Sequence, residues 1–191
     1  MMGWLGHLEL AAHGIVLQLA AISFMVHLGL SQAGPVRVGQ AFARGDWVAV
    51  KRTAAVTMGL STLAAVIAIF FFLATPQMLI SAFLDVEDLL APDILRIGTL
   101  LLIVAAMFQF VDAAQVVALS LLRGLQDTKM PMLIAAVSYW LIGLPISYVL
   151  GFSMDYKETG IWLGLVFGLG VAAVLLWVRF SVLTRGTHGR A

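Results

Sequence analysis

The sequence predicts an all-α integral membrane protein with five transmembrane helices, and three observations carry this prediction. Hydrophobic residues make up 62% of the 191 residues and charged residues only 11%, against about 25% charged residues in ordinary globular domains. Mean hydropathy is +1.03. Five apolar stretches each approach the roughly 20 residues that a helix needs to cross the hydrocarbon core of a bilayer. The predicted spans are residues 10–29, 53–75, 97–122, 133–152 and 159–180.

Proline residues mark most of the breaks between these spans. A proline lacks the backbone N–H, which does no harm at the start of a helix but interrupts a helix interior. Pro145 alone lies inside a span, where it removes the hydrogen bond to the Leu141 carbonyl, so we expect a kink there. The prolines expected at or beside boundaries are Pro35 (after Gly34), Pro76, Pro92 and Pro131.

Glycines recur every four residues in the last span, at Gly160, Gly164 and Gly168. A stripe of small residues allows a second helix to approach closely. Glycine is also common in membrane helices in general, and that explanation stays open.

Basic residues collect in alternate loops. The first loop, the third loop and the C-terminal tail hold nine of the eleven Lys and Arg residues, whereas the second loop is acidic. Because Lys and Arg favour the cytoplasmic side of a membrane, we expect these loops and the C-terminus in the cytoplasm. The nine are Arg37, Arg44, Lys51, Arg52, Arg123, Lys129, Arg179, Arg185 and Arg190, and the acidic loop holds Asp85, Glu87, Asp88 and Asp93.

The same topology places the start of the first span outside the cell, with nothing before it to carry it there. Met1–Gly6 resembles the end of an earlier transmembrane segment. An odd number of helices that begins outside predicts the C-terminal part of a longer protein. We expect residues 1–184 to form one transmembrane lobe and residues 185–191 a cytoplasmic tail.

One carboxylate, Asp112, stands inside the third span, and no other formal charge occurs between Ile97 and Leu122. An Asp at the centre of a membrane helix costs roughly 2.5–3.5 kcal/mol on insertion scales, and such residues as a rule face protein or a water-filled cavity and serve a function. A carboxylate in a cavity can exchange protons, or pair with Na⁺ or a cationic substrate. Asp112 is therefore the predicted cation-binding residue, with a structural hydrogen bond to a neighbouring helix as the alternative.

Polar and aromatic residues near Asp112 predict a substrate cavity. Gln109 and Gln115 lie three residues to either side of it, which we interpret as a narrow arc of one helical face, and Phe108 lies one turn before it. Tyr139 and Trp140, beside the expected kink, either line the same cavity or anchor their helix at the membrane surface.

The other polar residues indicate neither an enzyme nor a metal site. The sequence has no cysteine and no H-E-x-x-H, G-x-S-x-G or G-x-x-x-x-G-K-[ST] motif. His13 and His27 are fourteen residues apart, about 21 Å along a helix, and cannot share an ion. We expect satisfied or interfacial histidines, with His27 a possible cavity residue in a polar stripe with Gln18 and Ser23. Ser61 is expected to bond a backbone carbonyl. The net charge of +1 argues against a nucleic-acid partner.

Four local motifs resemble the multidrug and toxic compound extrusion (MATE) family, in its bacterial NorM-like branch. L-A-A-H-G-I at Leu10–Ile15 is similar to the family's L-A-A-H-Q-I. G-L-S-Q-A-G-P-V-R-V-G-Q-A-F-A-R-G-D, residues 29–46, looks like the loop after the eighth helix. F-Q-F-V-D-A-A-Q and R-G-L-Q-D-T, within residues 108–128, are similar to the tenth helix and the loop after it. Y-W-L-I-G-L-P at Tyr139–Pro145 looks like the eleventh helix, so the resemblance covers nearly the entire chain.

The resemblance implies a cation-coupled antiporter of the bacterial inner membrane. Members of the family have two six-helix lobes and expel cationic, aromatic compounds by using a Na⁺ or H⁺ gradient, with no other cofactor. The five spans would be helices eight to twelve, most of the C-terminal lobe, and Asp112 would match the acidic cation-site residue of that lobe. Because alternating access moves one repeat against the other, an N-terminal lobe or a second copy would be required, and this chain alone is expected to be inactive.

The sequence departs from the family pattern at a few positions. Phe108 stands where some relatives have tyrosine, which removes a hydroxyl that could ligate Na⁺ and leaves Na⁺ and H⁺ both open. Gly14 replaces the usual glutamine, and the helix-seven glutamate of the family would lie before Met1. Two alternative functions remain. One is a lipid-linked oligosaccharide flippase, disfavoured because such proteins need a more basic cavity and no Lys or Arg lies deep within a span, and the other is a non-transporting scaffold or degenerate fragment.

Overall fold

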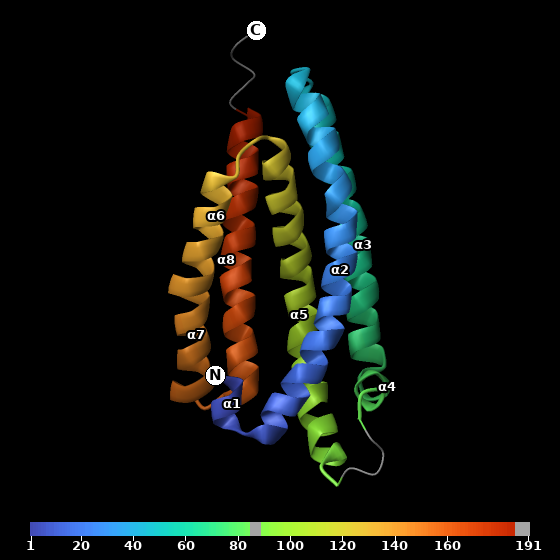
Figure 1. Cartoon of the computed structure of the whole chain (residues 1–191), viewed down its shortest axis with the longest axis vertical. Coiled ribbons are helices and arrows are strands. Elements are labelled where there is room, and N and C mark those ends of the chain that lie inside the picture. Colours follow the sequence, from blue (N-terminus) through green and yellow to red (C-terminus); the bar gives the residue numbers. More distant parts are fainter. Residues whose placement is uncertain (85–88, 186–191) are drawn as a thin grey trace.

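Five long helices run side by side in the computed structural model, which describes residues 1–84 and 89–185 (Figure 1). All five are long and apolar enough to cross a membrane, which confirms the predicted all-α membrane fold. They are α2 (His7–Ala43), α3 (Trp47–Ala74), α5 (Ala91–Gly124), a fourth helical segment (Lys129–Ser153) and α8 (Lys157–Arg185). Two short helices, α1 (Met2–Leu5) and α4 (Pro76–Ser81), precede α2 and follow α3.

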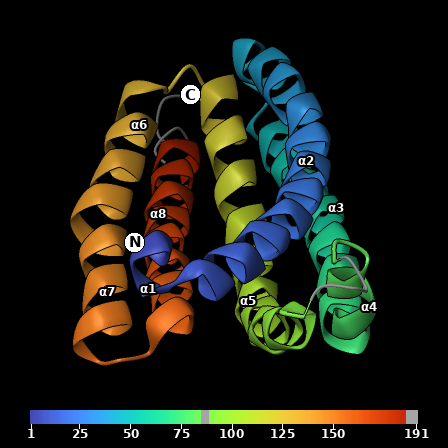
Figure 2. The ribbon, with the colours of Figure 1, turned by 60° about the horizontal axis from the view of Figure 1, so that its bottom comes forward.

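Helix α5 lies between α2 and α3 on one side and α8 on the other (Figures 1 and 2). The burial of adjacent residues agrees with this position. Leu121 and Leu122 point in different directions on the helix, and both are fully buried. The same holds for Leu101 and Leu102 nearer the other end. Asp112 lies near the middle of this central helix, so helices surround it on several sides.

Helix α2 is longer than predicted, and the boundary expected at Gly34-Pro35 is wrong. The helix continues through Pro35 to Ala43, and only residues 44–46 separate it from α3. Its continuation packs tightly against α5, since a Cβ on Gly124 would lie 2.8 Å from the Pro35 carbonyl oxygen. Neighbouring helices often compensate a proline inside a membrane helix, and here α5 supplies that packing.

The fourth helical segment packs mainly against α8, along the glycine stripe. A Cβ on Gly164 would clash with the Ser147 backbone and hydroxyl, and one on Gly168 would lie 2.8 Å from the Gly143 Cα. The Ser147 hydroxyl also donates a hydrogen bond to the Ile161 carbonyl oxygen at 3.0 Å. The close approach predicted from the glycine stripe is therefore confirmed.

The same segment accommodates Pro145 through wide helical turns. It begins as α6 (Lys129–Ala136) and continues as the π-helix η1 (Val137–Gly143), α7 (Leu144–Tyr148) and the π-helix η2 (Val149–Ser153). Prolines and π-turns both disrupt the regular hydrogen-bond ladder of an α-helix. The structure thus shows π-helical turns on either side of α7, and the kink expected at Pro145 stays a prediction.

The helix ends that carry basic residues lie together. The turn after α2, the loop after α5 and the end of α8 lie at the same end of the bundle (Figure 1). Most of the basic residues noted above therefore lie together at that end. Asp85, Glu87, Asp88, His188 and Arg190, and all of the expected tail after Arg185, lie outside the described residues.

Candidate cation and substrate cavity

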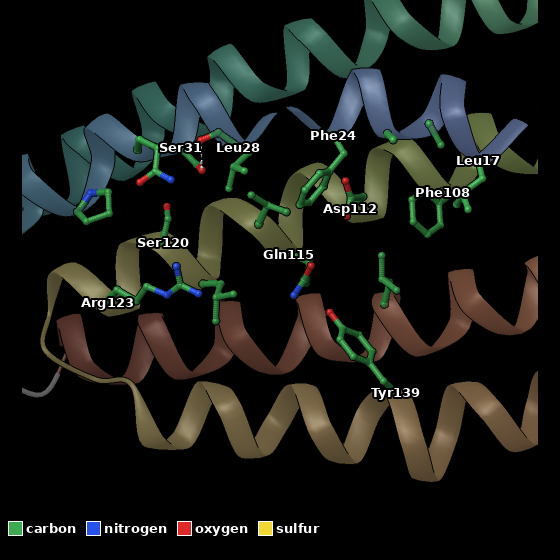
Figure 3. A pocket seen from close by; sticks show the side chains of 17 residues that line it. Leu17, Phe24, Leu28, Ser31, Phe108, Asp112, Gln115, Ser120, Arg123 and Tyr139 are labelled. Atoms are coloured by element: carbon green, nitrogen blue, oxygen red, sulfur yellow. Dashed lines mark hydrogen bonds between the residues drawn. The ribbon is translucent and has the colours of Figure 1, made fainter. Parts of the chain in front are cut away.

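Asp112 is held by α5 at the wall of a cavity between the helices (Figure 3). The residue is only 4% exposed, and its buried Oδ2 atom has no hydrogen-bond partner among the described residues. A buried polar atom without a partner destabilises the fold. This carboxylate is thus available to bind a proton or a cation from the cavity.

The cavity has a volume of about 700 Å³ and lies between α2 and α5 on one side and η1 and α8 on the other. That volume falls within the range typical of small-molecule pockets, about 300–1,000 Å³. Apolar side chains such as Leu17, Phe24 and Leu28 form most of its wall. The polar lining residues are Ser31, Gln32, Asp112, Gln115, Ser120, Arg123 and Tyr139.

Gln115 and Tyr139 meet across the cavity close to Asp112. Gln115 comes from α5, one turn after Asp112, and Tyr139 comes from η1 on the opposite wall. Figure 3 shows the Tyr139 hydroxyl turned toward the Gln115 amide. A carboxylate, an amide and a phenol, all of which carry oxygen atoms, therefore line one part of the cavity.

Phe108 supplies an aromatic wall beside this polar group. Its ring meets Trp162 of α8 edge to face, with centroids 5.7 Å apart and an interplanar angle of 76°. The Trp162 indole N–H in turn donates to His13 Nδ1 at 3.1 Å. His13 is therefore a satisfied histidine, as predicted, and it fixes the aromatic wall from α2.

Gln109 is fully buried but does not line the cavity. Successive residues of an α-helix are rotated by about 100°, so Gln109 and Gln115 lie about 60° to either side of Asp112 and about 120° from each other. The interpretation of a narrow arc was therefore wrong. Gln109 instead lies near His27 of α2.

His27 and Ser61 join α2 to α3 on that side of Asp112. Their Nδ1 and Oγ atoms are 3.0 Å apart, and both residues are fully buried. The expectation that Ser61 bonds a backbone carbonyl is wrong. The expected stripe of Gln18, Ser23 and His27 does not form either, since Gln18 is exposed.

Trp140 lies away from this cavity. It is 68% exposed and borders a smaller hollow of about 380 Å³, together with Met1, Leu144 and Leu165. The structure therefore brings together four of the six candidate residues. They are Asp112, Phe108, Gln115 and Tyr139.

Sequence reasoning missed the polar residues at one end of the cavity. Ser120 and Arg123 come from α5, and Ser31 and Gln32 from α2. Arg123 follows Asp112 by eleven residues, which returns an α-helix almost to the same face. That spacing is the signal that could have identified Arg123.

The described residues contain no cluster of three or more His, Cys, Asp or Glu side chains that could hold a metal ion. A lone carboxylate with amide and phenol groups nearby suits a proton, a monovalent cation or an organic cation. The aromatic and aliphatic walls suit an apolar ligand body. The cavity therefore combines one carboxylate with neutral polar groups, one arginine and apolar walls.

Comparison with known proteins finds relatives of this chain. The MatE family model matches residues 1–149. The probable multidrug resistance protein NorM of Agrobacterium fabrum (strain C58 / ATCC 33970) is 42% identical over 185 residues, which cover 97% of this chain and 40% of the relative. The protein of the same description from Xylella fastidiosa (strain 9a5c) is 37% identical over 188 residues, 96% of this chain and 38% of the relative. The chain thus spans about two fifths of the length of these curated relatives.

Two solved structures share the fold. The eukaryotic MATE transporter AtDTX14 matches with a TM-score of 0.80 at 17% identity, over 91% of this chain and 38% of that chain. An inward-facing MATE family multidrug resistance transporter matches with a TM-score of 0.80 at 13% identity, over 95% of this chain and 41% of that chain. At such identities the likeness concerns the fold alone.

Proposed function

This chain belongs to the MatE family, and on that premise we propose that it forms the C-terminal lobe of a cation-coupled antiporter that exports cationic, aromatic compounds. We place it in the bacterial cytoplasmic membrane as a multi-pass protein with its C-terminus in the cytoplasm. Its direct partners are the bilayer, the exported compound and a further lobe, and we propose no enzymatic step, no nucleic acid and no cofactor beyond the coupling ion. The multidrug resistance description of the bacterial relatives supports this assignment.

One observation carries the proposal. Within residues 1–84 and 89–185, the buried Asp112 Oδ2 atom has no hydrogen-bond partner, and it lies at the wall of a cavity of about 700 Å³. In our proposal Asp112 binds the coupling ion, Na⁺ or H⁺. The Gln115 amide and the Tyr139 hydroxyl supply further oxygen atoms, the ligand type that hard cations prefer. Tyr139 can thus provide, from another helix, the hydroxyl that Phe108 lacks.

Competition for Asp112 would couple the ion to the exported compound. A single carboxylate balances one positive charge at a time, so a cationic compound that approaches Asp112 displaces the coupling ion. Aromatic rings such as Phe108 attract organic cations through their faces. The apolar wall formed by Leu17, Phe24 and Leu28 would bind the rest of the compound.

Transport in this proposal requires a second lobe. Alternating access in repeat-built transporters moves one lobe against the other around a central site. We propose that an N-terminal lobe, or a second copy of this chain, completes the pathway. This chain by itself would bind the ion without moving it across the membrane.

Cation-dependent stability tests the role of Asp112. A ligand that binds only the folded state stabilises it by about 2.7 kcal/mol at 100 times its Kd. We expect Na⁺, but not choline at equal ionic strength, to raise the unfolding temperature of the purified chain in detergent, and Asp112→Asn to abolish this response. The matched control is Asp93→Asn, which removes an exposed carboxylate from the first turn of the same helix.

The same measurement distinguishes a proton from Na⁺. If the coupling ion is a proton, the stability difference between the wild type and Asp112→Asn varies with pH at constant Na⁺, and Na⁺ itself has no specific effect. If the wild type is folded and Asp112→Asn leaves the dependence of the unfolding temperature on Na⁺ and pH unchanged, Asp112 has a structural role.

A further inference from the structure

A groove between α2 and α3 carries three arginine side chains and is distinct from the cavity at Asp112. It has a volume of about 830 Å³ and lies toward the turn that joins the two helices, at the upper end of the bundle in Figure 1. Arg37, Arg44 and Arg52 line it, and all three are exposed. In the part of the chain that the structure describes, none of them forms an ion pair. The groove therefore presents positive charge that pairs with no acidic side chain of the described residues.

The lining changes from charged to apolar along the groove. From Arg44, which caps the end of α2, the lining runs inward along α2 through Arg37 to Leu30, and on α3 it runs from Arg52 to Leu60. Arg44 and Leu30 are fourteen residues apart, which corresponds to about 21 Å of helix. That length is more than half of the roughly 30 Å hydrocarbon thickness of a bilayer. The groove thus has a basic end at the membrane surface and an apolar continuation at acyl-chain depth.

We propose that this groove binds an anionic phospholipid. The arginines Arg37, Arg44 and Arg52 hold the phosphate, because guanidinium groups pair with phosphate in a bidentate geometry. One acyl chain lies along Val56 and Leu60, which are 55% and 49% exposed. Basic pockets between transmembrane helices are known to bind anionic head groups. A free phosphate would use only the charged end and leave the apolar part uncovered, so the full lining favours a lipid.

This site does not depend on the proposed antiport. Its residues lie on α2, on α3 and at the turn between them, and none of them lines the cavity that contains Asp112. Lipid binding can therefore be measured on the purified chain whether or not Asp112 binds an ion.

Lipid titration of the full chain in detergent tests the site, with bound lipid counted by native mass spectrometry. We expect dioleoylphosphatidylglycerol to bind more tightly than dioleoylphosphatidylcholine. The double variant R37Q/R52Q should weaken the phosphatidylglycerol affinity about 25-fold, because each basic residue near an anionic lipid contributes a factor of about five. The matched control K51Q/K129Q removes two exposed charges at the same end of the bundle but outside the groove, and should leave the affinity within about twofold.

Three results would overturn the assignment. Equal weakening by both double variants would mean that the attraction is general surface charge. Inorganic phosphate that competes as effectively as the lipid would mean that the acyl chain contributes nothing. An unchanged phosphatidylglycerol affinity in Val56→Ser, a variant of the apolar part, would likewise mean that the acyl chain contributes nothing to binding. Arg37, Arg52 and Val56 are all exposed, so these variants are expected to fold, and circular dichroism checks this.

Discussion

At the scale of single residues, His27 and Gln109 show how this bundle carries polar groups at membrane depth. Both are fully buried, yet the His27 Nε2 atom and both amide atoms of Gln109 have no hydrogen-bond partner in the described structure. The His27–Ser61 contact is the bond that ties this group to α3. Polar residues of this kind are costly in a membrane interior and are often functional. Gln109 and His27 thus extend the polar region of Asp112 toward α3.

Ser61→Ala tests the contribution of that bond. The substitution leaves the imidazole Nδ1 unpaired, and side-chain hydrogen bonds between membrane helices average about 0.6 kcal/mol with a maximum near 1.7 kcal/mol. We expect a loss of about 1 kcal/mol in the free energy of unfolding, measured by reversible denaturation in mixed micelles.

Ser31→Ala is the control for this substitution. Ser31 is as buried as Ser61, but its hydroxyl donates to the Leu28 carbonyl within its own helix, at 2.8 Å. Its removal should change stability by less than half as much. Equal losses of unfolding free energy in the two variants would show that the His27–Ser61 bond contributes no more to stability than a hydrogen bond within one helix.

At the scale of helices, the crossing of α8 with the fourth segment depends on glycine. Gly164 faces Ser147 so closely that no side-chain atom fits between them, and Gly160 faces the Leu150 carbonyl in the same way. Small residues allow two helices to pack closely. In a membrane this packing drives helix association, because the lipid tails are as apolar as the helices and the hydrophobic effect contributes little. The crossing therefore determines where η1 places Tyr139 in the cavity.

Gly164→Ala should destabilise the folded chain by about 1–3 kcal/mol, the usual effect of an added group in a tightly packed contact. Gly59→Ala is the matched control, because Gly59 lies in the exposed face of α3 and a Cβ there meets nothing within 4 Å. That control should be neutral or stabilising by up to about 1 kcal/mol, since alanine favours a helix. Thermal unfolding measures the change in stability of both variants, and equal changes would contradict the proposed packing role of Gly164.

At the scale of the whole molecule, the charges predict a single orientation in the membrane. Basic residues gather where α2 meets α3, where α5 meets the fourth segment and where α8 ends, and Figure 1 shows these points at one end of the bundle. By the positive-inside rule we expect a chain with this asymmetry to insert with that end in the cytoplasm. Helix packing collects the basic residues at one end, and their charge predicts the side of the membrane that this end faces.

Single cysteines can test this orientation without background, because the chain has no cysteine of its own. Thr128→Cys lies in the loop after α5, and Met154→Cys lies at the opposite end of the fourth segment, and both positions are exposed. In intact cells we expect a membrane-impermeant maleimide to label Met154→Cys strongly and Thr128→Cys only after permeabilisation. The reverse pattern would invert the topology.

The candidate site was partly predictable from the sequence. Asp112 could be identified because a carboxylate in an apolar span is costly wherever its neighbours lie. Gln115 and Phe108 followed from helical spacing, whereas the same spacing placed Gln109 in the cavity although it lies near His27 of α2. Trp140 was expected in the cavity because it lies near the kink predicted at Pro145, but adjacent residues on a helix point in different directions, and Trp140 is 68% exposed.

The sequence by itself determined the five membrane spans, the charge asymmetry and the central carboxylate. Each is a local property, since hydropathy and charge act on a segment before it meets its neighbours. Only the tertiary structure decided that α2 continues through Pro35, that Ser61 pairs with His27, and that η1 brings Tyr139 opposite Gln115. These features arise from packing between helices that are distant in sequence, and no periodicity within one helix records which neighbour it will meet.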